Sequence, residues 1–438
     1  MCDNQVMNIL RKKGVILSTF IKKQRQNGYL YFKKMKLLLA VILISVVGTS
    51  VFCGSGRDAM AQNTQPIILV HGLFGYGPDE MCGINYWGQA KKAPCKVPLY
   101  EASVGPISSS HDRACELFAQ IKGTQVNYGT NHSQTAGHEP TGKNYTNKGF
   151  YPNWSEENPI HLVGHSLGGP TIRMLQYLLQ QDYWGVGTNE NWIKSVTCIS
   201  GVLNGSTLPY MLGCNEKTGL LEGPIGGFLS KTLELIVGIT SSQIEDFYDF
   251  DLGHWGLTRQ KTESLSDFIG KIANTKLFKE KDNAAYDLTV QALIEQNKLI
   301  QTFPNTYYFS YVTEQTNWMP LTGTQFPDFC MNPFLAVASA YMGAKTFASS
   351  LYPGFKNSDW WENDGAVSSY SQMYPRISGT HPVAGEFSDA TSTFEPGAWY
   401  WQYLHDLNHL NVVMMPKPFP KDWQKDFYTK LFARLAEL

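Results

Sequence analysis

Hydrophobic and polar positions follow two alternating patterns through the central part of the chain. Short apolar, β-branched runs that break off at turn-forming residues predict buried strands at residues 66–70 (PIILV), 160–169 (IHLVGHSLGG) and 192–200 (WIKSVTCIS). Apolar residues at spacings of three and four predict helices at Ala114, Leu117, Phe118 and Ile121, and at Ile172, Leu175, Leu178 and Leu179. Strands that alternate with helices predict an α/β fold with a mainly parallel central sheet flanked by helices.

Two segments depart from this alternation. Residues 123–159 are polar and rich in Gly, Asn and Thr, which predicts a long loop. Loops of this length in compact domains are usually functional or flexible, and this one contains His132 and His138. Residues 219–244 are mostly apolar with a Gly-rich start, so they form either a helix of the core or a mobile cover.

The N-terminal part of the chain has the pattern of an export signal. Basic residues precede the apolar run of residues 37–47 (LLLAVILISVV), and the A-x-A pattern of residues 59–61 follows it. The run is too short to span a bilayer comfortably, and a buried N-terminal helix is the alternative. We therefore expect residues 1–61 to be an N-terminal extension and secretory signal peptide. The mature chain would start near residue 62 and be extracellular or periplasmic.

The rest of the chain, residues 62–438, is predicted to be a single domain, because no linker, repeat or low-complexity tract interrupts it. With 43% hydrophobic residues in 438, a disordered or fibrous class is excluded. The first 61 residues hold 10 of the 36 Lys and Arg and 2 of the 37 Asp and Glu, so the remainder carries a net charge of −9. This acidic balance argues against nucleic acid as a partner, and no stable protein partner is indicated.

The segment Gly164-His165-Ser166-Leu167-Gly168 matches G-x-S-x-G between a predicted strand and a predicted helix. That context places a serine on a sharp turn above the sheet, next to a helix N-terminus that favours developing negative charge. Ser166 is therefore the predicted nucleophile. The predicted oxyanion hole consists of the backbone N–H of Leu167 and that of Leu73, in the loop after the first strand.

A serine nucleophile needs a base and an acid that orients the base, and in this fold they follow in the order Ser, Asp or Glu, His. Asp364, in an Asn-Asp-Gly turn, is the leading acid, and His409, late in the chain, is the leading base. The competing residues are Asp328, Asp359 and Asp389 for the acid, and His381 and His405 for the base. The pattern alone leaves these alternatives open.

A series of segments in one order resembles a known family, the secreted lipases of staphylococci and thermophilic bacilli. The segments are PIILVHG, NYWG (85–88), VGPISSSHDRACE (104–116), GHSLGG, YDF…HWGL (248–257), AYDLT (285–289), NTYYFSYVTE, LTG (321–323), MNPF and WENDG (361–365). The resemblance extends over roughly residues 66–435. It implies an α/β-hydrolase fold, with Asp364 as the acid, His409 as the base and a helical lid at about residues 214–245.

The resemblance also implies a function. The expected activity is that of a serine ester hydrolase, a triacylglycerol lipase that acts on acylglycerols at a lipid–water interface. A carboxylesterase or a phospholipase A1 could use the same residues. Two other classes stay open: a hydrolase whose metal does the catalysis, and an inactive lipid-binding protein with a hydrolase fold.

A structural zinc site is a further implication of the resemblance. Three of the four implied ligands are present as Asp112, His132 and His138. The fourth ligand of the family is an Asp, but Gly253 stands at that position and has no ligand side chain. His254, Asp251 or a water molecule could complete the site, and we take His254 as the candidate fourth ligand.

Members of the family also bind calcium through a Glu and an Asp just after the catalytic histidine. Asn411 and Pro416 occupy those positions, so both carboxylates are missing, although Gly323 remains as a carbonyl donor. Because calcium prefers several hard oxygen ligands, we predict that the family-type calcium site is absent.

Overall fold

A computed structural model describes residues 65–78, 80–81, 84–237, 248–260, 262–391, 393–417 and 420–438. These residues belong to one compact unit, Asn63–Leu438. The predicted signal peptide lies outside the described residues. Within the described part of the chain, no helix is long and apolar enough to cross a membrane.

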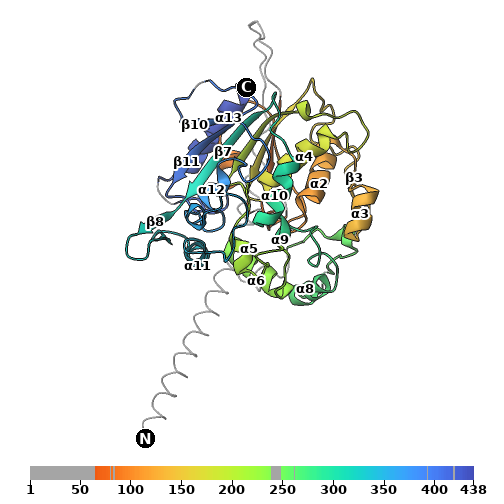
Figure 1. Cartoon of the computed structure of the whole chain (residues 1–438). Coiled ribbons are helices and arrows are strands. Elements are labelled where there is room, and N and C mark those ends of the chain that lie inside the picture. Colours follow the sequence, from red (N-terminus) through yellow and green to blue (C-terminus); the bar gives the residue numbers. More distant parts are fainter. Residues whose placement is uncertain are drawn as a thin grey trace, which may run out of the picture. The chain divides into compact units, whose positions relative to one another are not determined.

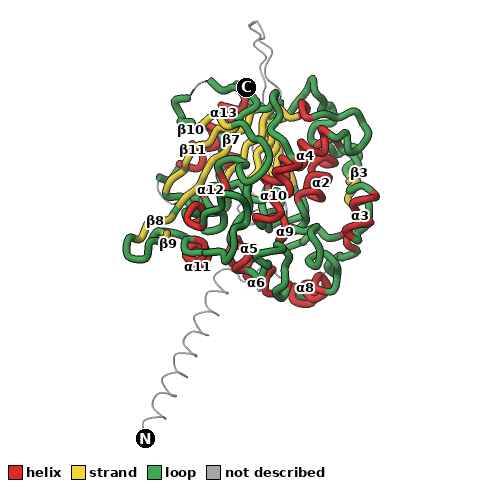
Figure 2. Tube along the Cα trace, viewed as in Figure 1, coloured by secondary structure: helices red, strands yellow, loops and turns green. Residues whose placement is uncertain are grey.

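A seven-stranded sheet forms the centre of the unit, in the order β10-β11-β7-β6-β5-β1-β2 (Figures 1 and 2). Its strands are β1 (Ile67–Val70), β2 (Leu99–Ala102), β5 (Ile160–His165), β6 (Ile193–Ile199), β7 (Tyr307–Glu314), β10 (Val383–Glu386) and β11 (Trp399–His405). All six neighbouring pairs in this sheet are parallel. The parallel α/β architecture predicted from the hydrophobic pattern is confirmed.

The sheet separates two hydrophobic clusters. Ile67 and Leu69 of β1 belong to one cluster, and Ile68 and Val70 belong to the other, because successive side chains of a strand point to opposite faces. Burial on both faces explains why β1 is an uninterrupted apolar run, and every residue of β5 is buried as well.

Helices cover both faces of the sheet (Figure 2). They are α2 (Ser110–Lys122), α3 (Thr130–Ala136), α4 (Gly168–Gln180), α5 (Leu208–Met211), α6 (Ile225–Val237), α8 (Leu265–Ala273), α9 (Ala284–Asp287), α10 (Val290–Leu299), α11 (Pro333–Met342), α12 (Ser369–Gln372) and α13 (Trp423–Ala436). Short 3-10 turns are η1 (Ala90–Lys92), η2 (Glu190–Trp192), η3 (Gly253–Trp255) and η4 (Asn357–Trp360). The start of α2 follows from its cap, since the Ser109 side chain accepts a hydrogen bond from the Asp112 N–H.

The long loop predicted at residues 123–159 contains regular structure. The strands β3 (Gln125–Asn127) and β4 (Thr141–Asn144) pair antiparallel, and α3 lies between them. Of α3, only Ser133 and Ala136 are buried, so the helix has no apolar stripe that a hydrophobic pattern could reveal. The loop prediction was wrong for these elements because their side chains are polar and largely exposed.

The apolar stretch 219–244 includes α6, which packs against α8 and α11. Residues 238–244 of the stretch lie outside the described residues. A second antiparallel pair, β8 (Thr316–Met319) and β9 (Thr324–Pro327), forms a hairpin beside α11. In Figure 1, α6, α8, α11 and β8 lie at the same end of the compact unit as α5.

Candidate active site and metal site

Ser166 stands on the sharp turn between β5 and α4. Its φ of 56° is in the left-handed region, which non-glycine residues rarely adopt. A Cβ on Gly164 would lie 2.4 Å from the carbonyl oxygen of Gly168, and one on Gly168 would lie 2.3 Å from that of Val70. Glycine is therefore required on both sides, and the turn has the strained geometry expected of a nucleophile elbow.

His409 and Asp364 are joined by a hydrogen bond of 2.8 Å between Nδ1 and Oδ2. The Asp364 carboxylate is fully buried and accepts four further hydrogen bonds, from Thr313 Oγ1, Gln372 Nε2, and the N–H groups of Ala366 and Val367. The carboxylate is therefore fixed, and it fixes the plane and tautomer of the imidazole that it contacts.

Four of the five competing candidates are engaged elsewhere. His405 contacts Glu314, His381 contacts Thr302, and Asp389 pairs with Lys430. Asp328 accepts hydrogen bonds from Asn317 Nδ2 and the Cys330 N–H. The predicted pair of Asp364 and His409 is the one that the structure brings together.

Ser166 and His409 line one narrow apolar cavity of about 30 Å³. Phe228 and Thr232 of α6 form part of its wall, and Leu208 of α5 forms another part. Only 6% of the Ser166 surface is exposed, and α6 is one of the elements that enclose the cavity beside it.

Two backbone N–H groups beside Ser166 have no hydrogen-bond acceptor among the described residues, those of Leu73 and Leu167. The chain around Leu73 passes close to the nucleophile, because a Cβ on Gly72 would lie 2.7 Å from the Ser166 Cβ. These are the two donors that the sequence predicted for an oxyanion hole.

A buried hydrogen-bond chain connects this loop to the base. Tyr86 Oη accepts the Gly72 N–H at 2.9 Å and contacts His165 Nδ1 at 2.7 Å, and His165 Nε2 contacts the His409 carbonyl at 3.0 Å. A carbonyl can only accept, so His165 Nε2 carries the proton and Tyr86 donates to Nδ1. Burial, followed by the nearby His409 imidazole, holds the pKa of His165 well below its ordinary value and keeps the ring neutral. Tyr86 and His165 were not among the predicted site residues, although they lie in the segments NYWG and GHSLGG.

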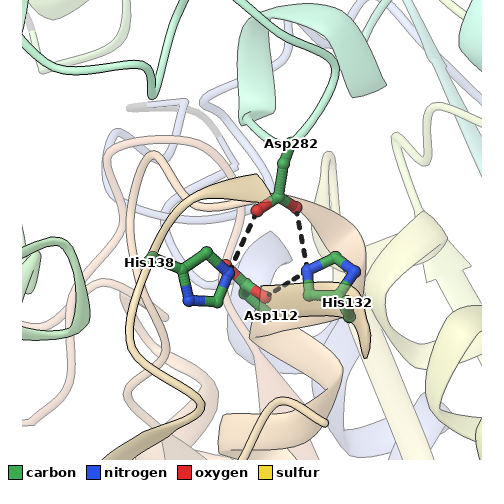
Figure 3. Close-up of side chains that lie close together, drawn as sticks. All are labelled: Asp112, His132, His138 and Asp282. Carbon is green, nitrogen blue, oxygen red and sulfur yellow. Dashed lines mark hydrogen bonds and ion pairs between the residues drawn. The ribbon is translucent and has the colours of Figure 1, made fainter. Parts of the chain in front are cut away.

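A second group of polar side chains lies apart from this cavity. Asp112 of α2, His132 of α3, His138 just after α3, and Asp282 just before α9 have ligand atoms that all lie within 4.8 Å of one another (Figure 3). Each of the two imidazoles contacts both carboxylates, at 3.1 and 3.3 Å for His132 and at 3.6 and 3.3 Å for His138. Asp282 was not among the sequence candidates.

The bonding within this group is incomplete. Asp112 Oδ2, His138 Nε2 and Asp282 Oδ2 are buried and have no hydrogen-bond partner among the described residues. Four ligands around zinc at about 2.0–2.1 Å would be about 3.3 Å apart, which is close to the observed contacts. Two neighbouring buried carboxylates and two imidazoles are a donor set that fits a bound cation.

His254 and its neighbours lie beside the group. His254 Nε2 is 3.3 Å from Asp112 Oδ2 and is likewise buried without a hydrogen-bond partner among the described residues. Asp251 forms an ion pair of 2.7 Å with Lys143 instead. A Cβ on Gly253 would meet nothing within 4 Å, so the position has room for a side chain that this chain lacks.

Comparison with known proteins decides the family. The profile of the lipase-like C-terminal domain family matches residues 63–436. The chain belongs to this family. It is 33% identical over 385 residues to a lipase of Staphylococcus epidermidis and 31% identical over 383 residues to lipase 1 of Staphylococcus aureus. Each match covers 82% of this chain but only 51% or 52% of the relative, so the chain spans about half the length of the curated relatives it matches.

Solved structures give the same assignment. The chain superposes on EstA from Clostridium botulinum with a TM-score of 0.72 and 31% identity, covering 87% of this chain and 89% of that one. For the Staphylococcus hyicus lipase the TM-score is 0.66 and the identity 27%, with 87% and 98% covered. The fold of this lipase-like family member is that of an α/β-hydrolase, as expected from the sequence.

Proposed function

We propose that the protein is a secreted serine ester hydrolase, and specifically a triacylglycerol lipase. One observation carries the proposal: Ser166 on its strained turn and His409, fixed by Asp364, line the same apolar cavity. The names of the relatives in the lipase-like family support the ester-hydrolase class. A carboxylesterase or phospholipase A1 is the alternative that uses the same residues.

The residues act in the order of an acyl-enzyme mechanism. His409 takes the proton of the Ser166 hydroxyl as the oxygen attacks the ester carbonyl, and Asp364 stabilises the resulting imidazolium. The N–H groups of Leu73 and Leu167 stabilise the oxyanion. His409 then gives its proton to the leaving alcohol, and a water molecule, deprotonated by the same imidazole, releases the acid.

The closed cavity requires a movable cover. We propose that α6, within the predicted lid region 214–245, moves to admit the substrate, because Phe228 and Thr232 form the cavity wall beside Ser166. The wall is almost entirely apolar, which suits an acyl chain rather than a charged substrate.

We propose further that Asp112, His132, His138 and Asp282 hold a structural zinc ion. Bound zinc would neutralise two buried carboxylates and tie α2, the α3 segment and the segment before α9 together. His254 contacts Asp112 but does not belong to the mutually close set of ligand atoms, so it would orient that carboxylate rather than complete the set. None of these residues lines the cavity of Ser166, which argues against a hydrolase whose metal does the catalysis.

The decisive variant is Ser166→Ala. Ester hydrolysis should fall by roughly 10⁴-fold or more, while the melting temperature stays within a few degrees. Ser206→Ala is the matched control, because Ser206 lines the same cavity but donates its hydroxyl to the Ala366 carbonyl. If Ser166→Ala kept its activity, or if the wild type hydrolysed no ester at all, the proposed function would be wrong.

Secretion rests on the sequence of residues 1–61. Expression of the whole chain in a bacterial host should place the protein outside the cytoplasm with a new N-terminus near residue 62. N-terminal sequencing of that fraction is the measurement, and an uncleaved cytoplasmic chain would contradict the proposal.

A further inference from the structure

Exposed apolar side chains gather in one short part of the chain. Of 11 large hydrophobic side chains that are exposed in the described residues, seven lie between residues 318 and 337. We call these seven the apolar patch: Trp318, Met319, Leu321, Phe326, Phe329, Phe334 and Val337. Leu321 is 95% exposed and Phe329 is 100% exposed, so the most accessible members of the patch face solvent almost completely.

The β8–β9 hairpin presents apolar side chains on both of its faces. Trp318 pairs with Gln325, and Phe326 pairs with Asn317. Paired residues share a face and successive residues alternate, so Trp318 and Phe326 point to opposite faces. Leu321 lies in the turn that joins the strands, which makes the tip apolar as well.

The patch carries almost no charge. Between Gln315 and Ala344 the sequence holds one charged residue, Asp328. The Asp328 carboxylate accepts hydrogen bonds from Asn317 Nδ2 and the Cys330 N–H, so it is part of the local turn. A surface of this kind favours an uncharged, apolar environment.

The patch is continuous with the elements that close the active site. β9 packs against α11, and α11 packs against both α5 and α6. These two helices provide Leu208, Phe228 and Thr232 to the wall of the Ser166 cavity. A particle that docks on the apolar patch therefore lies next to α5 and α6, the helices that line the Ser166 cavity (Figure 1).

We propose that the apolar patch is the surface through which the enzyme docks on aggregated lipid, the neutral surface of an ester emulsion. The β8–β9 hairpin inserts its tip and both of its faces into the lipid. A fluid apolar medium can surround both faces, whereas a folded protein partner would cover only one. Docking presents α6 and the cavity below it to the lipid. The inference rests on the proposed function, since it names the physical form of the substrate.

The test compares two double variants. Leu321→Ser with Phe329→Ser removes the two most exposed members of the patch. Val186→Ser with Leu299→Ser removes two side chains outside it that are 58% and 49% exposed. Each pair is made in the active chain and in the Ser166→Ala background, in which binding is measured without hydrolysis. The probes are a triolein emulsion coated with phosphatidylcholine and a soluble short-chain ester.

The patch variant should bind the emulsion at least about tenfold more weakly and hydrolyse it correspondingly more slowly. Its kcat/KM on the soluble ester should stay within about twofold of wild type, and the control pair should match wild type in both assays. Equal emulsion binding by the two double variants would overturn the docking proposal. So would sedimentation that shows a wild-type dimer which the patch variant abolishes, because the patch would then join two copies of the chain.

The outcomes separate the two proposals. If the wild type hydrolyses the soluble ester but the patch variant binds emulsion normally, docking fails and the ester-hydrolase proposal stands. If no ester is hydrolysed but emulsion binding depends on the patch, the hydrolase proposal fails and docking stands.

Discussion

The catalytic residues around Ser166 and the group around Asp112 both combine aspartate and histidine side chains, but their hydrogen bonding differs. In the first, the Asp364 carboxylate accepts five hydrogen bonds, and the tautomers of His165 and His409 follow from their partners. In the second, Asp112 Oδ2, Asp282 Oδ2 and His138 Nε2 have no hydrogen-bond partner among the described residues. A carboxylate whose oxygens all accept hydrogen bonds from the protein holds its histidine in place for proton transfer. Buried carboxylate oxygens without a hydrogen-bond donor instead fit a bound cation.

The largest expected effect concerns the completed site. Asp364→Asn keeps the shape of the side chain but places an amide against His409 Nδ1, which favours the wrong imidazole tautomer. The kcat for ester hydrolysis should fall by about 10⁴-fold while the melting temperature changes little. An Asp364→Asn variant with near-normal kcat would show that another acid orients the base.

Removal of the metal tests the proposed zinc site around Asp112. Stripping the metal leaves two buried carboxylates together, at a cost of about 3–5 kcal/mol, and should lower the melting temperature by roughly 5 °C or more. Below the new melting temperature the chain should keep most of its activity.

Asp282→Asn should lower the zinc content of the purified chain, measured by elemental analysis. Asp251→Asn should leave the zinc content unchanged, because Asp251 pairs with Lys143. Chelation that abolishes activity without any loss of thermal stability would assign the metal to catalysis instead.

An effect of intermediate size is expected at His161, a buried histidine that belongs to neither site. Burial, and then Lys194, lowers the pKa of His161 to about 3, below its ordinary value of 6.5. The unfolded chain therefore binds an extra proton below pH 6.5, and the contribution of His161 to stability is lost as pH falls from 6.5 towards 3.

The stability advantage of wild type over His161→Asn should consequently narrow by about 2–3 kcal/mol between pH 7.5 and 4.5. Urea unfolding at the two pH values measures this difference. A gap that stays constant would mean that His161 is protonated in the folded chain as readily as in the unfolded one.

The smallest expected effect concerns the link between the oxyanion loop and the base. Tyr86→Phe removes the hydroxyl that joins Gly72 to His165, so kcat should fall about tenfold with KM unchanged. Tyr76→Phe is the matched control, because Tyr76 packs against Tyr86 but its hydroxyl donates to Met414 Sδ and, within the described part of the chain, to no other group. If Tyr86→Phe lowered the melting temperature and left kcat unchanged, the chain of hydrogen bonds would serve stability alone.

Hydrophobic periodicity was enough to predict the parallel sheet, because β1, β5 and β6 are buried on both faces. The turn around Ser166 was also readable, since its geometry demands Gly164 and Gly168. By contrast, α3 escaped prediction because its exposed polar side chains give no apolar pattern.

Residues brought together only by tertiary structure were the hardest to predict. Asp282 meets Asp112 across 170 positions of sequence, and its Lys-Asp-Asn context resembles any polar turn. The family resemblance favoured His254, next to Gly253, but Asp282 in the segment before α9 is the residue that contacts both His132 and His138. Tyr86 escaped in the same way, because only the fold brings its hydroxyl between Gly72 and His165.

Covalent labelling tests the central claim, a serine nucleophile separate from the metal group, most directly. Metal-loaded and chelated chains are treated with a fluorophosphonate, and the labelled peptide is identified by mass spectrometry at a temperature where both remain folded. We expect a single adduct on Ser166 in both samples, formed at similar rates. Labelling at another residue, or labelling of Ser166 that disappears on chelation while the chain stays folded, would contradict it.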